Sequence, residues 1–204
     1  CEHTTVGDRI EAGTFLTAGA LLGGPVTVKG IDPSFLRMAL MKLEHMGCAV
    51  ETSDDSITVS RTQPLQATDI QTLPHPGFPT DMQPQIAAVL SIADGTSIIT
   101  EGVWDSRFRY VEQLTFMGAD IQVDGKMAVI TGVECLKPSP VRAVDLRAGA
   151  AMIIAGLSAN GITEIEEIDH IDRGYENVVE KFSALGADIK RVKSFDNIKA
   201  LKQA

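Results

Sequence analysis

The segments HMGCAVE (45–51), FMGADIQ (116–122) and ALGADIK (184–190) look like three copies of one stretch, and they decide the fold. Their shared glycines lie about 70 residues apart, a period too long for the common solenoid repeats. Apolar residues coincide around each copy at helical spacing. The period fits two helices with strands, so the sequence predicts three copies of one small α/β unit.

Each unit begins with a helix that is apolar nearly all round, as helices buried inside a protein are. These buried helices are expected at 15–22, 82–93 and 146–159. A glycine ends each of them, and a strand follows. The strands are expected at 26–29, 97–101 and 163–166.

A second, amphipathic helix follows, and we expect Asp32, Asp105 and Asp172 to cap its start in the three units. Strands after the repeat glycine are expected at 49–52, 120–123 and 188–192, with return strands at 57–60 and 127–131. The third unit has no return strand. Its open sheet edge is expected to be completed by residues before Asp8, by a missing segment of a longer protein or by a second molecule.

Buried helices inside and sheets outside predict an inside-out α/β barrel of three βαβαββ-type units, the third incomplete. An ordinary two-layer α/β sandwich is the alternative that periodicity alone leaves open. The expected domain covers 8–193, after a hinge or linker at 1–7 and before a polar tail at 194–204. Its units are expected at about 8–71, 72–144 and 145–193.

Composition restricts the classes of function. The 204 residues carry a formal net charge of −9, which argues against a nucleic-acid partner, because Lys and Arg supply that affinity. No apolar stretch reaches the roughly 18 residues of a membrane span, and no secretory leader opens the chain, so neither membrane insertion nor secretion is expected. Cys1, Cys48 and Cys135 have no metal-ligand or disulfide spacing, which favours a reducing cytoplasm. The first residue is Cys1 and no methionine precedes it, so we expect the chain to be a piece of a longer protein.

Three prolines in TLPHPGFPTDMQ (72–83) restrict the backbone that leads to Thr80 and Asp81. Thr80 and Gln83 fit a capping box, so one interpretation is that Asp81 only stabilises a helix start. The other interpretation is that the stiff approach fixes the Asp81 carboxylate in a cleft as a general base.

Two further segments place charges near expected helix starts. In AVDLRAGAA (143–151), Asp145 precedes a buried helix and is expected to pair with Arg147, or simply to cap the helix. In HIDRGYE (170–176), Arg173 is expected at a helix start, where it could bind a phosphate or carboxylate through two hydrogen bonds. We expect Asp81, Asp145 and Arg173 to converge at one end of the threefold structure.

Arg107 lies at the equivalent place in the second unit, beside Trp104. A solvated surface charge is the alternative interpretation for each arginine, and core packing is the alternative for Trp104. No spacing indicates a metal site, a Walker loop or a Ser/His/Asp arrangement.

Four motifs, in this order and spacing, resemble the enolpyruvyl transferases that act on UDP-N-acetylglucosamine; they are DRIEAGTF (8–15), FPTDMQPQ (78–85), DLRAGAA (145–151) and HIDRGYE (170–176). The likeness runs from about Asp8 to Val192. It implies transfer of the enolpyruvyl group of phosphoenolpyruvate to the sugar 3-hydroxyl, with release of phosphate, in the bacterial cytoplasm. This is the first committed step of peptidoglycan synthesis, and the resemblance implies no cofactor or metal.

The resemblance also implies a role for each matching residue. Asp81 would be the general base for the 3-hydroxyl, Arg173 would bind phosphoenolpyruvate, and Asp145 would assist proton transfer at the methylene carbon. The implied substrate-binding residues are Thr80, Val103 against the UDP-sugar, Arg107 near the closed interface, and Arg147.

Members of this family have two domains that close on substrate, and the resemblance covers only the second. The missing N-terminal domain, an expected partner, would carry a phosphate-binding lysine, a second arginine and a mobile loop. Trp104-Asp105-Ser106 departs from the usual aromatic, acidic, amide triplet. Two alternatives are a non-catalytic module that binds sugar nucleotides or assembles with proteins, and the shikimate-phosphate branch of the same enzymes.

Overall fold

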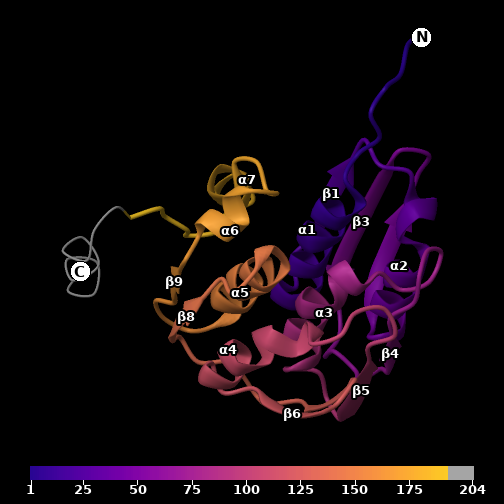
Figure 1. Ribbon diagram of the computed structural model, residues 1–204. Coiled ribbons are helices and arrows are strands. Elements are labelled where there is room, and N and C mark those ends of the chain that lie inside the picture. The colour runs from indigo at the N-terminus through magenta and orange to yellow at the C-terminus, as the bar shows by residue number, and fades with distance from the viewer. Residues whose placement is uncertain (193–204) are drawn as a thin grey trace.

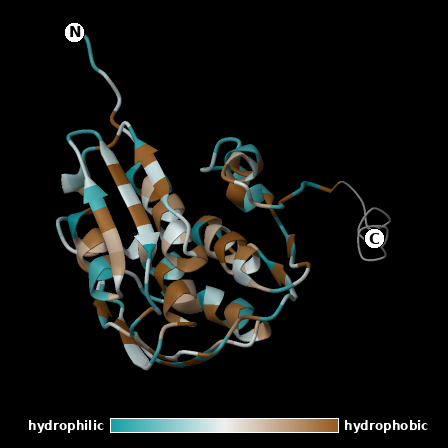
Figure 2. Cartoon of the chain, turned by 180° about the vertical axis from the view of Figure 1, so that it is seen from behind, coloured by the Kyte–Doolittle hydropathy of each residue, from teal (hydrophilic) through white to brown (hydrophobic). Residues whose placement is uncertain are grey.

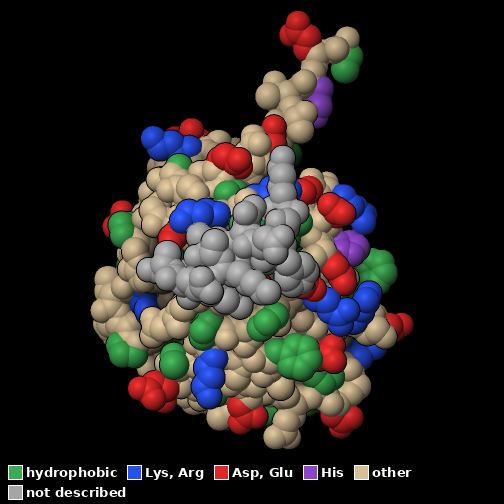
Figure 3. Space-filling view, turned by 90° about the vertical axis from the view of Figure 1, so that its left-hand side faces the viewer, with side chains coloured by type: hydrophobic (Ala, Val, Ile, Leu, Met, Phe, Trp, Pro, Cys, Tyr) green, Lys and Arg blue, Asp and Glu red, His purple; other side chains and the backbone are tan. Residues whose placement is uncertain are grey.

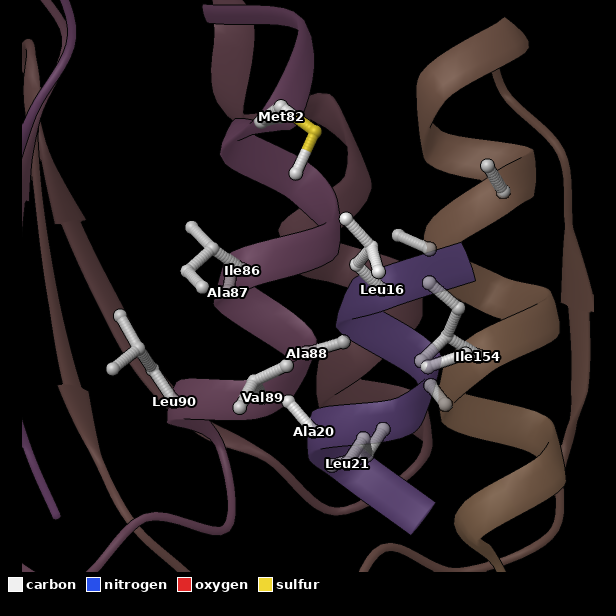
Figure 4. Packing of buried hydrophobic residues seen from close by; sticks show 14 of the residues in the cluster. Leu16, Ala20, Leu21, Met82, Ile86, Ala87, Ala88, Val89, Leu90 and Ile154 are labelled. Atoms are coloured by element: carbon white, nitrogen blue, oxygen red, sulfur yellow. The ribbon is translucent and has the colours of Figure 1, made fainter. Parts of the chain in front are cut away.

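Three central helices form the core of the structure, a computed structural model that describes residues 1–192. They are α1 (Arg9–Leu22), α3 (Gln83–Leu90) and α5 (Leu146–Ser158), which pack against one another with the sheets outside them (Figure 1). Every residue of α3 is buried. Small side chains such as Ala20 and Ala88 lie where the helices meet, which permits close approach (Figure 4).

The first unit is a three-stranded antiparallel sheet in the order β1 (Val26–Lys29), β3 (Ser56–Arg61), β2 (Cys48–Thr52). The return strand β3 lies in the middle, and its buried residues alternate, as in a sheet with one face on the core. A 3₁₀ turn, η1 (Pro33–Leu36), and α2 (Arg37–His45) form the outer helix. All three strands predicted for this unit are confirmed.

The second unit repeats the order with β5 (Thr96–Thr100), β7 (Met127–Thr131) and β6 (Asp120–Asp124). A short strand, β4 (Ile70–Gln71), adds to the other edge of β5 in parallel. The outer helix consists of η3 (Arg107–Tyr110) and α4 (Val111–Phe116). Figure 2 shows hydrophobic residues along the central helices and a mixture of hydrophobic and hydrophilic residues along the strands.

In the described part of the third unit, β8 (Pro140–Arg142) and β9 (Glu164–Glu166) pair in parallel. The chain continues through α6 (Asp169–Asp172) and α7 (Val178–Ala184). The strand predicted at 188–192 is wrong, because this stretch has no strand conformation. Its equivalents β2 and β6 each pair with a return strand, and within residues 1–192 the third unit has none. The predicted polar tail at 194–204 lies outside the described residues, as does the last residue of the predicted domain.

Only the first of the three predicted aspartate caps forms. Asp32 accepts a hydrogen bond from the Ser34 amide at the start of η1. Asp105 instead pairs with Lys126 at 2.8 Å, and η3 begins at Ser106 without a side-chain cap. In both wrong predictions the carboxylate binds a cation and not the amides of a helix start.

In the third unit that cation is Arg191. Its two terminal nitrogens donate to Asp172 at 2.8 and 2.6 Å, and Asp172 ends α6 instead of opening a helix. The hydrogen bond to Arg191 is the main cause that lowers the pKa of Asp172. Figure 3 shows acidic and basic side chains interspersed on the face that carries this unit.

The first and third units meet along α1 and α7. Lys181 donates to Glu11 at 2.6 Å, and the rings of Phe15 and Phe182 lie 4.6 Å apart between centroids. Beside this contact, a cavity of about 870 Å³ opens between the carboxyl ends of α1 and α5, β9, and residues 187–192. Its wall is largely apolar and includes Leu22, Ile162 and Leu185, each of which is exposed.

Candidate active site

The amino ends of the three central helices meet at one end of the molecule. Asp8 caps α1 by accepting from the amides of Ile10 and Glu11, and Asp145 caps α5 by accepting from those of Arg147 and Ala148. A 3₁₀ turn, η2 (Thr80–Met82), leads into α3 beside them. Because the exposed amides of a helix start carry partial positive charge, this end of the core favours anions.

Asp81 lies on η2 between two arginines. Nη2 of Arg107 donates to Oδ1 of Asp81 at 3.0 Å, and Nη2 of Arg147 is 3.4 Å from Oδ2. The Asp81 side chain is 42% exposed, whereas each arginine side chain is only 16% exposed. An ionised carboxylate has about four acceptor positions, so two guanidinium contacts leave room for a further hydroxyl group.

Arg147 is held from the other side by Tyr175. Its Nη1 is 3.3 Å from the Tyr175 hydroxyl, and the guanidinium carbon lies 5.8 Å from the ring centroid. Burial works to lower the pKa of Arg147, but Tyr175, followed by Asp81 and Asp8, outweighs burial and leaves the pKa raised. Arg147 is therefore a fixed positive charge beside the Asp81 carboxylate.

A second carboxylate, Glu101, lies beneath this surface and is only 2% exposed. Its Oε2 accepts from the Thr80 hydroxyl at 3.0 Å and from Nε2 of Gln83 at 2.9 Å. Its Oε1 accepts from the amides of Val103 at 2.8 Å and Trp104 at 2.9 Å. The predicted capping box does not form, because Thr80 and Gln83 both donate to Glu101 and neither side chain accepts a hydrogen bond from a backbone amide at the helix start.

Four of the seven predicted site residues contact one another. Thr80, Asp81, Arg107 and Arg147 are linked by the contacts above and by a 3.2 Å bond from Arg107 to the Thr80 carbonyl. Asp145 caps α5 as predicted, but the Arg147 side chain pairs with Asp81 and not with Asp145.

Arg173 follows α6 in the third unit. It is exposed at the carboxyl end of α6, so its predicted place at a helix start is wrong. Its guanidinium makes no hydrogen bond or ion pair with any residue in the described part of the chain.

Val103 and Trp104 are exposed on the loop that follows β5, and Trp104 reaches 59% exposure. The interpretation of Trp104 as core packing is therefore wrong. Within residues 1–192 no three His, Cys, Asp or Glu side chains are arranged to hold a metal ion. No helix in this part of the chain has the length and apolar character to cross a membrane.

The profile of one protein family, described as EPSP synthase (3-phosphoshikimate 1-carboxyvinyltransferase), matches residues 1–182. The chain belongs to this family of enolpyruvyl transferases. It is 53% identical over 193 residues to UDP-N-acetylglucosamine 1-carboxyvinyltransferase 3 of Caldanaerobacter subterraneus subsp. tengcongensis, covering 95% of this chain and 46% of that protein. It is 48% identical over 191 residues to UDP-N-acetylglucosamine 1-carboxyvinyltransferase 2 of Bacillus cereus, covering 94% and 44%.

Solved enolpyruvyl transferases have the same α/β fold. The enolpyruvyl transferase NikO from Streptomyces tendae superposes with a TM-score of 0.85 at 30% identity, covering 94% of this chain and 46% of that one. EPSP synthase from Acinetobacter baumannii superposes with a TM-score of 0.64 at 22% identity, which supports the fold alone. The chain spans about half the length of the relatives it matches.

Proposed function

We propose that this chain is the half of a UDP-N-acetylglucosamine 1-carboxyvinyltransferase that supplies the general base. The observation that carries the proposal is the Asp81 carboxylate, which is half exposed and fixed between Arg107 and Arg147 at the amino ends of the central helices. The names of the relatives in Caldanaerobacter and Bacillus support this choice of substrate. Their bacterial source and the free state of the three cysteines support a bacterial cytoplasmic location.

The proposed reaction is an addition followed by an elimination. The 3-hydroxyl oxygen of the sugar bonds to C2 of phosphoenolpyruvate, its proton passes to Asp81, and the methylene carbon gains a proton. Elimination then breaks the C2–O bond to phosphate, and the methyl carbon loses a proton. A general base needs a tightly fixed position, which the two arginines provide for Asp81.

The other site residues take supporting roles in this proposal. Arg147 and the helix amides stabilise negative charge near the reacting atoms. Asp145 assists the proton transfer at the methylene carbon, and Val103 contacts the UDP-sugar. The exposed guanidinium of Arg173 binds phosphoenolpyruvate once the second domain closes over it, with Arg107 near the closed interface.

The same proposal includes the rest of the enzyme. The domain is an inside-out α/β barrel of three units, and the third sheet is completed by a segment outside the described residues. In the first two sheets the middle strand lies between the strands that precede and follow the outer helix. The equivalent place in the third unit lies between β9 and residues 187–192, which both line the 870 Å³ cavity. The complementary domain supplies the missing half of the anion-binding residues.

The test is Asp81→Asn in the two-domain protein. We expect phosphate release to fall by at least about a thousandfold, because the amide cannot accept the hydroxyl proton. Binding of UDP-N-acetylglucosamine, measured by calorimetry, should be retained. Asp54→Asn, at an exposed carboxylate of the first unit, is the matched control and should leave turnover unchanged. Full turnover by Asp81→Asn would refute the base assignment.

The shikimate branch is a second candidate, because the matching family profile is named for it. Supplying 3-phosphoshikimate and UDP-N-acetylglucosamine in separate assays distinguishes the two substrates. Absence of UDP-sugar binding in calorimetry, even with the complementary domain present, would instead favour a non-catalytic module.

A further inference from the structure

Glu101 is a buried carboxylate to which the proposed reaction gives no role. It follows β5 directly, on the same face as the buried residues Ser97 and Ile99. Burying a carboxylate is costly unless it is hydrogen-bonded, and Glu101 accepts from four donors. The two oxygens bond different segments, because Oε2 faces η2 and Oε1 faces the loop at 102–106.

The Glu101 side chain therefore joins the η2 turn to the loop at 102–106. The η2 segment carries Asp81, and the loop carries the exposed side chains of Val103 and Trp104. The far end of the same loop is also tied to η2, because Arg107 bonds both the Asp81 carboxylate and the Thr80 carbonyl. The loop is therefore attached to the Asp81 turn at its beginning by Glu101 and at its end by Arg107.

We propose that Glu101 is a positioning residue that holds the loop at 102–106, and so the exposed side chains of Val103 and Trp104, in a fixed place relative to Asp81. The inference rests on the proposed function, since it assigns the loop as the wall against which the sugar nucleotide is aligned with the base. Only a carboxylate of this length bonds both segments through oxygen. Glutamine has a single acceptor oxygen, and methionine has the length without either oxygen.

Trp104 reports on this attachment directly, because it is the only tryptophan in the chain. The first measurement is fluorescence anisotropy and acrylamide quenching of Trp104 in the 204-residue chain without substrate. We expect Glu101→Met to lower the anisotropy and to raise the quenching constant about twofold, since a freed loop exposes the indole further. Glu101→Gln should give an anisotropy and a quenching constant between those of the wild type and Glu101→Met. Asp105→Asn is the matched control, because Asp105 adjoins Trp104 but bonds Lys126, and it should change neither signal.

Thr80→Val provides a milder variant in case Glu101→Met does not fold, as judged by circular dichroism. It removes one donor on the η2 side and leaves the loop itself intact. A change of Trp104 anisotropy in the direction of Glu101→Met supports the proposal. Unchanged Trp104 signals in the folded Glu101→Met protein, or in Thr80→Val if the former is unfolded, overturn it.

Kinetics in the two-domain protein separate this inference from the proposed function. Glu101→Met should raise KM for the UDP-sugar at least about fivefold with a smaller change in kcat, because a misplaced wall weakens binding more than proton transfer. Asp81→Asn should instead lower kcat strongly, with a smaller change in KM for the UDP-sugar. If the wild-type protein does not turn over but Trp104 responds as expected, the proposed function fails and the positioning role stands. If the enzyme turns over and Glu101→Met changes neither constant, the positioning role is wrong.

Discussion

Tyr175 joins all three central helices through one hydroxyl group. Its oxygen is 2.9 Å from the Thr14 hydroxyl of α1, 3.5 Å from Nε2 of Gln85 in α3 and 3.3 Å from Nη1 of Arg147 in α5. The side chain is 2% exposed. A buried hydroxyl with several partners stabilises only when its bonds are satisfied, and its removal costs each partner one hydrogen bond, although Thr14 and Gln85 stay bonded to each other.

Tyr175→Phe should therefore lower the free energy of unfolding by about 1–3 kcal/mol, as measured by urea denaturation. The matched control is Tyr110→Phe. The Tyr110 hydroxyl is also fully buried but has no hydrogen-bond partner within residues 1–192, so its removal should be neutral or stabilising. Equal losses in the two variants would show that the hydroxyl network does not contribute.

At this scale the sequence motifs single out candidate residues but not the partners that these residues contact. Asp81 and Arg147 stand in recognisable motifs, but their mutual contact joins residues 66 positions apart. Tyr175 and Thr14 are 161 positions apart, and no local pattern connects them. Glu101 had a usable signal, since two-residue alternation along β5 places it on the buried face.

Among the elements, those fixed by local hydrogen-bond patterns agree best with the sequence. The strands β1 and β7 have the predicted bounds. A glycine turn joins β7 locally to β6, whereas β1 pairs with the distant strand β3, so only its preceding glycines and alternating side chains indicated it. The helix starts expected at Asp105 and Asp172 were harder to predict. In the structure, a lysine or arginine from elsewhere in the chain binds each of these carboxylates. The strand expected at 188–192 needed a partner that the local sequence does not contain.

The bond between Asp172 and Arg191 makes the placement of residues 187–192 dependent on pH. Because the pKa of Asp172 is lowered in the folded chain, its contribution is complete above the ordinary aspartate pKa of about 3.9 and is lost as pH falls below it. Solvent screens the pair, so the contribution should be at most about 1 kcal/mol.

We expect Asp172→Asn to increase hydrogen exchange at pH 6 in the segment 185–192, where the amides of Leu185, Gly186 and Ala187 bond to α7. It should also remove most of the change in protection between pH 6 and pH 3 that remains after correction for the intrinsic pH dependence of amide exchange. Mass spectrometry of the exchanged peptides measures this. High salt should reproduce part of the effect in the wild type. Asp188→Asn is the control, since Asp188 pairs with the exposed Lys190 and not with α6. Identical exchange in the wild type and Asp172→Asn would contradict the prediction.

For the whole molecule, the helix starts that carry Asp81 and Arg147 lie together at one end of the core. Parallel packing of α1, α3 and α5 places their amino ends together, and this arrangement needs all three copies. The internal repeat predicted the α/β class of the fold, and the convergence of the site residues at one end stays a prediction. It did not predict the contacts between units, because those depend on side chains that differ from copy to copy.

The isolated 204-residue chain should release no phosphate from phosphoenolpyruvate and UDP-N-acetylglucosamine. It spans about half the length of its relatives, and one open end of a core cannot exclude water or surround a substrate with several negative charges. A phosphate-release assay with the purified chain, before and after adding the complementary domain, measures this. Turnover by the chain alone would contradict the prediction.

The contact between α1 and α7 also affects how the protein is made. Glu11 and Lys181 are 170 positions apart, and Phe15 meets Phe182 beside them. At synthesis rates of roughly 5–20 residues per second, a ribosome adds the second half of this contact on the order of 10–30 s after the first. During that interval the apolar side of α1 lacks its partner, and the nascent chain is open to aggregation or to capture by chaperones.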